Sequence, residues 1–260
     1  MKSILCIGVA VALTLSTHAA LAADDCTQII STGHPEYPAM AFKDGDRIRG
    51  AAPSLVKAIA SDLNVPLESQ YMGSWADAQA ATRDGEADMN FGVYYNDERA
   101  KYLHYVQPGF AYDPVNVFVV QDMPFEYKGQ SDLIGKKGAT NKGESYGTQF
   151  DAFMKEKLEI VRTDGIAKAF ESLLAGDVDY VIAGYYPGQA EATRLDIDDK
   201  IVPLEPPVVS DEMFVAFSKK SPCASLAPKF GEGVEKLTTD GSFEQMMRDA
   251  MAQWAGKEKP

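Results

Sequence analysis

This sequence contains few of the side chains from which metal centres and nucleophilic active sites are built. Its 260 residues include three cysteines, three histidines and two tryptophans. Only His34 and His104 lie beyond the first 22 residues, and no Ser-His-Asp, Cys-His or metal-ligand spacing is evident. A metal site needs three or four such ligands, and covalent catalysis needs a paired base. We therefore expect no cofactor, no metal and no enzymatic activity.

Basic residues are also scarce. The chain has 25 Lys and Arg against 38 Asp and Glu, a net charge of −13. Residues 1–22 contain Lys2 and no acid, so the remainder has 24 basic and 38 acidic residues, or −14. This charge argues against binding to nucleic acid or to anionic membrane surfaces. It does not by itself predict a cationic ligand, because an acidic surface also serves solubility.

Long hydrophobic runs are absent except at the N-terminus. Lys2 is followed by an apolar run from Ile4 to about Leu15 and then by Ala-Leu-Ala at 20–22. A charged start, a short apolar stretch and small residues predict a secretory signal peptide, residues 1–22. The run is too short to span a bilayer, and an uncleaved N-terminal anchor is the alternative. We expect a periplasmic mature chain that starts near Ala23.

Two cysteines remain after removal of this segment, since Cys6 lies within it. Cys26 and Cys223 form an even pair in an oxidising compartment, which predicts a disulfide. The bridge would close a loop of about 197 residues, for which the chain-entropy estimate is on the order of 5 kcal/mol. Two free thiols are the alternative.

Strand and helix patterns alternate along the mature chain. Helices are predicted at 53–64, 74–85, 144–157, 165–176 and beyond 225. Strands are predicted at 26–33, 65–72, 87–93, 116–121, 133–141, 158–163, 178–184 and 211–219. This alternation is typical of α/β folds in which helices cover both faces of a parallel sheet.

Two Pro-containing extended segments divide the chain. They are AYDPVN (111–116) and LEPPVVSDE (204–212). Segments of this kind about ninety residues apart predict paired crossovers between two lobes. One lobe would then combine 23–114 with 210–260, and 115–209 would form the other. The predicted disulfide would join the two ends of the first lobe.

Three segments of the mature chain follow the order of motifs in a known family. They are STGHPEYPAMAFKDGDRIRGAAPSLVKAIASDLN, SWADAQAATRDGEADMNFGVYYNDERAKYLHYVQPG and LIGKKGATNKGESYG. The series resembles the family 3 extracellular solute-binding proteins over essentially the whole mature chain. The resemblance implies a two-lobed periplasmic binding protein of type II and a monomer. Its ligand would lie between the lobes, and its partner would be an inner-membrane ABC transporter permease.

The resemblance also implies ligand contacts from the first lobe. Arg99 matches the arginine that holds a ligand carboxylate, for which a guanidinium provides a bidentate fork. The alternative is a surface arginine that pairs with Asp97 or Glu98. Tyr37 and Trp75 match the aromatic residues that enclose the ligand side chain, although a tryptophan at a helix start also suits a core.

The sequence departs from the family where an amino group would bind. Small hydroxyl residues on the strand before the arginine are replaced by Phe91, Gly92 and Tyr94. The family's aspartate after the second-lobe strand corresponds here to Gly184, which is followed by Tyr185. The acidic residue that the family often has in the first loop corresponds here to His34. Glu36 and Glu144 are the nearest substitutes. The resemblance thus supports the carboxylate end of an amino-acid ligand and leaves the ammonium end open.

Two tyrosine pairs end strands in the two halves of the chain, at 94–95 and 185–186. We expect both ends to face the cleft, with at most one tyrosine of each pair directed inward, because adjacent strand residues alternate faces. The alternative is that both pairs only cap the core. Glycine at such an end lets ligand or backbone approach closely.

The segment KGESYG (142–147) is predicted to begin a helix. Free backbone N–H groups there would favour an anionic group, to which Ser145 could also donate. Lys142 would close over a second acidic group of the ligand. Glu144 would either complement the helix dipole or pair with an ammonium.

These features predict capture of a small carboxylate-bearing ligand, an amino acid or a derivative, for delivery to an ABC transporter. One alternative is a cyclohexadienyl-dehydratase-like enzyme on the same scaffold. The other is a sensory binding protein that presents its ligand to a receptor.

Overall fold

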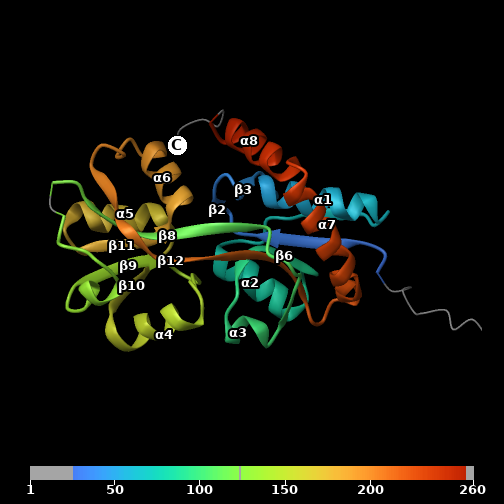
Figure 1. The fold of residues 1–260 in the computed structure, drawn as a ribbon, viewed down its shortest axis with the longest axis horizontal. Helices are drawn as coiled ribbons and strands as arrows, with labels where there is room; N and C mark the ends of the chain where they lie inside the picture. Colours follow the sequence, from blue (N-terminus) through green and yellow to red (C-terminus); the bar gives the residue numbers. More distant parts are fainter. Residues whose placement is uncertain (1–25, 123, 256–260) are drawn as a thin grey trace, which may run out of the picture.

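One mixed sheet runs through the whole molecule and joins its two lobes (Figure 1). The computed structural model describes residues 26–122 and 124–255, so the predicted signal peptide, residues 1–22, lies outside it. Within these residues nine strands belong to the sheet, in the order β10-β9-β11-β8-β12-β6-β1-β5, with β7 paired to β12. The strands are β1 (Ile29–Gly33), β5 (Leu67–Ser69), β6 (Met89–Tyr94), β7 (Leu103–Tyr105), β8 (Ala111–Val120), β9 (Lys137–Asn141), β10 (Glu159–Thr163), β11 (Tyr180–Gly184) and β12 (Ile201–Ser218).

Parallel strands form each end of this sheet. In the first lobe β1 pairs in parallel with β5 and β6, and in the second lobe β9 pairs in parallel with β10 and β11. A small antiparallel sheet of β2 (Glu36–Tyr37), β3 (Ala41–Asp44) and β4 (Arg47–Arg49) adds to the first lobe. The predicted two-lobed α/β architecture is confirmed.

The two predicted crossovers are the central strands β8 and β12. They pair antiparallel from Ile201 opposite Val120 to Met213 opposite Ala111, with a shift of register between Leu204 and Val209. β12 then continues along β6 as far as Phe217. The crossovers therefore support each other through backbone hydrogen bonds and are continuous with both lobes.

Helices cover both faces of the sheet (Figure 1). In the first lobe α1 packs with α7 and α8, while α2 and α3 lie across the sheet from them. None of the helices in residues 26–122 and 124–255 is long and apolar enough to cross a membrane. The helices are α1 (Ala51–Asp62), α2 (Trp75–Asp84), α3 (Asp97–Ala100), α4 (Thr148–Lys157), α5 (Ile166–Ala175), α6 (Tyr185–Arg194), α7 (Ala227–Thr239) and α8 (Ser242–Ala255), with 3-10 turns η1 (Gln130–Leu133) and η2 (Pro222–Leu226).

Local signals set the ends of α2. Ser74 caps its first turn in a reciprocal box with Asp77, and Gly85 ends it in the left-handed conformation. These two residues are the first and last of the helix predicted at 74–85. This capping fixes the first residue of the helix, Trp75, at the boundary between the lobes.

The predicted disulfide between Cys26 and Cys223 is present. It joins the residue three places before β1 to the buried second residue of η2. The bond ties the start of the mature chain to the C-terminal part of the first lobe, as the cysteine count suggested.

Two boundaries differ from the sequence prediction. The helix expected from residue 144 begins at Thr148, because Gly143 and Gly147 adopt positive φ and keep 142–147 as a loop. Glu144 is therefore a loop residue and not part of a first helical turn. The second tyrosine pair does not end a strand but begins α6, a helix whose Pro187 and Gly188 resemble turn signals in the sequence.

Candidate functional site

Six residues form a ring where the lobes meet, near the carboxyl ends of the first-lobe strands. Each contacts the next through a hydrogen bond or a ring contact, and the link between Arg99 and Tyr94 is to the Tyr94 backbone carbonyl. Ligands of open α/β sheets bind at such strand ends. In ring order the members are Arg99, Tyr94, Asp113, Tyr37, His34 and Trp75.

Arg99 supplies the positive end of the ring. It lies in α3, 4 % exposed, and its guanidinium donates to Gln79 Oε1 (2.9 Å), Gly143 O (3.1 Å) and Tyr94 O (3.3 Å). No carboxylate of the described residues pairs with it; Glu98 pairs with Lys101 instead. All three acceptors are neutral, so the charge is buried without an ionic partner. Such a group is costly unless an anion compensates it.

Asp113 of β8 supplies the negative end. Its Oδ2 accepts hydrogen bonds from the hydroxyls of Tyr37 and Tyr94, the latter at 2.7 Å. Its Oδ1 is buried and has no partner among the described residues. Burial raises the pKa of Asp113 to about 6; the two phenol hydrogen bonds oppose this shift, and the nearby charge of Glu144 adds to it. Burial, with the charge of Asp113 second, also raises the pKa of both tyrosines well above the usual value.

His34 and Glu144 link the two lobes beside this acid. The Nδ1 atom of His34 accepts from the Glu36 backbone N–H (2.9 Å), so it is unprotonated. Nε2 therefore carries the ring N–H, which donates a hydrogen bond to Glu144 Oε1 (2.9 Å). Both side chains are buried. The loop that carries Glu144 thus presents a second carboxylate to the same region.

Aromatic rings close the circle between His34 and Arg99. The His34 ring lies 5.4 Å from that of Tyr37 and 5.2 Å from that of Trp75. The Arg99 guanidinium lies 5.5 Å from the Trp75 ring centroid, near enough for cation–π attraction. Trp75 Nε1 is buried and unpartnered among the described residues, which leaves an N–H donor at this position.

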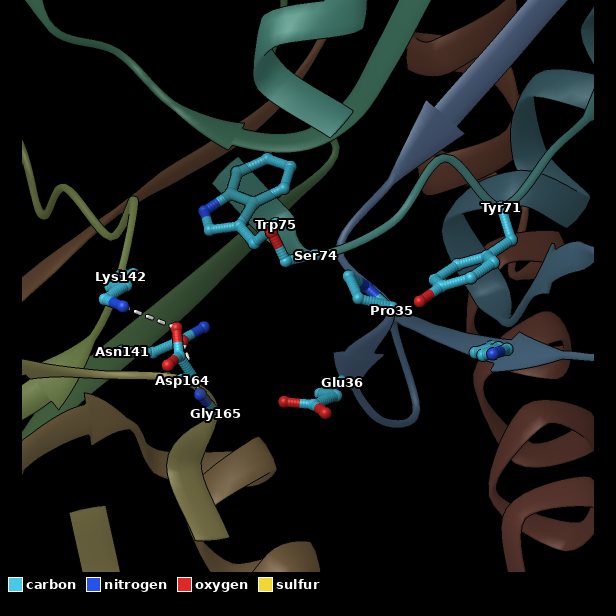
Figure 2. Close-up of a pocket in the computed structure, with 10 residues that line it drawn as sticks. Pro35, Glu36, Tyr71, Ser74, Trp75, Asn141, Lys142, Asp164 and Gly165 are labelled. Atoms are coloured by element: carbon cyan, nitrogen blue, oxygen red, sulfur yellow. Dashed lines mark hydrogen bonds and ion pairs between the residues drawn. The ribbon is translucent and has the colours of Figure 1, made fainter. Parts of the chain in front are cut away.

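A pocket of about 310 Å³ opens between the lobes beside Trp75 (Figure 2). Figure 2 shows first-lobe and second-lobe side chains facing each other across it, with the Glu36 carboxylate directed toward the loop of Gly165. This volume is at the lower end of the range for small-molecule sites. The pocket is lined by Pro35, Glu36, Lys43, Tyr71, Ser74, Trp75, Asn141, Lys142, Asp164 and Gly165.

Some residues predicted for the site have other partners. Phe91 is fully buried in the core and packs where a side chain on Gly33 would lie. The Ser145 hydroxyl accepts from Asn96 and donates to the carboxylate of Asp151. Asp151 also accepts from the Tyr146 backbone N–H, so a protein carboxylate takes the anion position proposed at this helix start. Lys142 forms an exposed ion pair with Asp164 (2.7 Å) at the edge of the pocket.

The glycines and tyrosines at the strand ends behave differently in the two lobes. Tyr94 points inward and Tyr95 is 45 % exposed, as alternation predicts. Gly92, with φ of 75°, lies against Met213. In the other lobe the rings of Tyr185 and Tyr186 meet edge to face within a helix, so strand alternation does not apply.

Gly184 carries no side chain, and two side chains of the ring fill the space in front of it. A Cβ built on Gly184 would overlap the Tyr37 hydroxyl and lie 2.8 Å from Asp113 Oδ2. Sequence reasoning missed Asp113. Its signal was present: it is the only charged residue in the otherwise uncharged stretch AYDPVNVFVV.

Metal binding has no support in this geometry. Within residues 26–122 and 124–255, no three His, Cys, Asp or Glu side chains gather as metal ligands would. The ring instead combines a guanidinium, one carboxylate and flat aromatic walls, with the Glu144 carboxylate beside it, which suits a small polar organic molecule.

Comparisons with known proteins agree with this architecture. Residues 29–254 match the sequence profile of the bacterial extracellular solute-binding proteins, family 3. The chain is similar in structure to the amino acid ABC transporter substrate-binding protein AbpA from Streptococcus pneumoniae, bound to L-arginine, with 22 % identity and a TM-score of 0.72 over 89 % of this chain and 97 % of that one. Comparison with curated protein sequences gives no match.

Two further solved structures share the fold. The arginine-, lysine-, histidine-binding protein ArtJ from Geobacillus stearothermophilus is 21 % identical, with a TM-score of 0.69 over 89 % of this chain and 96 % of that one. A histidine kinase sensor domain with similarity to periplasmic binding proteins is 24 % identical, with a TM-score of 0.72 over 90 % of this chain and 98 % of that one. At these sequence identities, the similarity to the three solved structures shows a shared two-lobed fold and nothing more specific.

Proposed function

This chain belongs to family 3 of the bacterial extracellular solute-binding proteins, and from that premise we propose that it captures a small carboxylate-bearing ligand between its lobes. The ligand class is an amino acid or a derivative, in keeping with the ligands named for the similar structures. Delivery is to an inner-membrane ABC transporter permease, by a monomer in the periplasm after removal of residues 1–22. The function includes no reaction step.

The observation that carries this proposal is the buried, ionically unpaired guanidinium of Arg99. Its three neutral acceptors hold it in place without neutralising it. A ligand carboxylate would supply the missing charge through charge-assisted hydrogen bonds, each worth about 1.5–3 kcal/mol. Trp75, whose ring lies beside the guanidinium, would form an adjacent wall.

The lobes proposed for this capture are residues 23–114 with 210–260, and 115–209. Several hydrogen bonds join them beside Arg99: Gln79 Nε2 donates to Gly143 O (2.9 Å), and the Asp97 N–H donates to Thr148 Oγ1 (3.1 Å). These contacts describe a closed arrangement. We infer that opening swings the 142–148 loop away about β8 and β12, a hinge motion that ligand binding reverses.

The test combines a thermal-shift screen of the mature chain with calorimetry. Carboxylates that bind only the folded state raise the melting temperature by mass action. For the best carboxylate, Arg99→Ala should weaken binding by about 30- to 1,000-fold, the effect of removing one partner of a buried charge pair. Arg83→Ala is the matched control, because Arg83 is an exposed arginine on α2. Unchanged affinity in Arg99→Ala would refute the proposal.

A further inference from the structure

We propose that Asp113, on the crossover strand β8, is the anchor for a protonated amino group of the ligand. The inference deepens the proposed function and rests on it. It narrows the ligand from any small carboxylate to one that also has an N–H-bearing cationic nitrogen. The residue lies on a different element from the strand end at Gly184, where the sequence has no acidic side chain.

The first argument is position. β11 and β8 are antiparallel neighbours, with Gly184 opposite Val115. Asp113 lies two residues before Val115 on β8, and its side chain is therefore on the same face of the strand. Because Gly184 has no side chain, the Asp113 carboxylate reaches to within 2.8 Å of where its Cβ would be. An acid from the crossover thus occupies the space in front of the second-lobe strand end.

The second argument is the unused oxygen. The two tyrosine hydroxyls converge on Oδ2, whereas Oδ1 is buried without a partner among the described residues. No basic side chain of these residues forms an ion pair with Asp113; the charged group that acts on it is Glu144, of the same sign. A buried carboxylate with a vacant acceptor, beside a second acid, favours a cation that donates hydrogen bonds.

The third argument is the connection between the charged ends. Tyr94 connects them, because its backbone carbonyl accepts from Arg99 and its hydroxyl donates to Asp113. The two charged ends therefore lie against opposite ends of one tyrosine residue. A carboxylate on Arg99 and an ammonium on Asp113 would satisfy both ends together.

The nature of the free acceptor selects the nitrogen. Oδ1 needs an N–H donor, which primary and secondary ammonium groups have and a quaternary ammonium lacks. The aromatic rings of Tyr37, Trp75 and His34 would attract any cation, but they cannot satisfy this oxygen. We therefore expect the protein to bind ligands with a primary or secondary ammonium more tightly than ligands with a quaternary ammonium, and more tightly than analogues without a cationic nitrogen.

The experiment measures calorimetric affinities for L-amino acids, 2-hydroxy acids with the same side chains, and betaine. Wild type should bind its best amino acid at least 100-fold more tightly than the matched hydroxy acid, and more tightly than betaine. Asp113→Asn keeps the shape and the acceptor for the tyrosines. It should weaken amino-acid binding by about 30-fold or more and reduce the preference over the hydroxy acid to a few-fold.

Asp211→Asn is the control, since Asp211 lies directly opposite Asp113 on β12 but is exposed. It should leave both affinities unchanged. A second measurement needs no variant: amino-acid affinity of wild type should fall up to tenfold per unit as pH drops below 6, because protonation of Asp113 competes with the cation. The groups that face Asp113 are Tyr37, Tyr94 and Glu144, and hydroxy-acid affinity should not show this fall.

The outcomes separate the two proposals. Arg99-dependent binding of hydroxy acids as tight as that of amino acids would overturn the role of Asp113 and leave the carboxylate site intact. Retention of the full preference for the amino acid in Asp113→Asn would overturn that role as well. If no carboxylate binds, or if Arg99→Ala has no effect, the proposed function fails and the amino-group anchor falls with it.

Discussion

Asp113 Oδ2 lies 2.8 Å from the point at which a side chain on Gly184 would begin. The two residues are 71 positions apart in the sequence and meet because β8 runs antiparallel to β11. The Asp113 carboxylate of β8 can lie this close to β11 because Gly184 has no side chain. Their relationship makes the space in front of Gly184 a tightly filled part of the site.

Gly184→Ala should therefore destabilise the protein. The added methyl would overlap the Tyr37 hydroxyl and press on Asp113, both of which are buried. Overpacking of this kind costs about 1–3 kcal/mol of unfolding free energy, measurable by urea denaturation. Gly129→Ala is the control, because a Cβ there meets no atom within 4 Å, and it should change stability little. Equal stability of the two variants would contradict the packing described at Gly184.

Asp113 should impose a pH dependence on stability. Its pKa is about 6 in the folded protein against 3.8 for an ordinary aspartate. Between these values the folded state holds a proton that the unfolded state has lost, so raising the pH lowers the free energy of unfolding. The loss amounts to about 3 kcal/mol, is complete above pH 6, and is absent below about pH 4.

Asp113→Asn should remove this decline, as measured by urea unfolding at intervals from pH 4 to pH 7. Asp46→Asn, a change at an exposed aspartate, should keep it. If the unfolding free energy of Asp113→Asn and of wild type fell in parallel from pH 4 to pH 7, this carboxyl would not titrate in the expected window.

Loss of the Cys26–Cys223 bridge should lower stability strongly. The unfolded chain gains freedom when a loop of 197 residues is released, so Cys26→Ala with Cys223→Ala should cost about 2–5 kcal/mol. Reduction of wild type should lower the unfolding free energy by a similar amount. Thiol titration of the unfolded, unreduced mature chain should find no free cysteine, and two free thiols would exclude the bridge.

The hydrogen bond between His34 and Glu144 should favour the closed arrangement without ligand. A hydrogen bond to a charged group contributes about 1.5–3 kcal/mol, so His34→Ala should increase the radius of gyration in small-angle scattering. Lys142→Ala is the control, because Lys142 pairs with Asp164 within the same lobe at an exposed position. A radius unchanged by His34→Ala would mean that other contacts govern closure.

Features set by short stretches of sequence could be predicted. Ser74 and Gly85 delimit α2 through local capping, and the 3.6-residue spacing of Leu55, Val56 and Ile59 defines the buried face of α1. The crossovers were recognisable because extended, Pro-containing segments stand out between helices. The fold followed from these signals and from the order of motifs.

Features set by pairing between distant segments could not be predicted from the sequence. The Asp113 carboxylate depends on which strand lies beside β11, and nothing near Asp113 in the sequence indicates this. Two helix starts differ from the prediction for local reasons. The positive φ of Gly143 and Gly147 keeps 142–147 as a loop, and Asp151 accepts from the Tyr146 N–H at its end. In α6 a proline and a glycine in the first turn concealed the helix, although proline is acceptable where N–H groups have no partner.

The insertion of β12 between β6 and β8 has a consequence for how the protein is made. A chain synthesised from its N-terminus has completed β6 and the whole of the second-lobe sheet core before residues 213–217 exist. Until then β6 has an unpaired edge and the first lobe cannot close its sheet. The contiguous second lobe can fold as soon as β11 is available, whereas the first lobe, although it begins earlier, must finish last. Truncation even a few residues before Phe217 should therefore leave an aggregation-prone nascent chain.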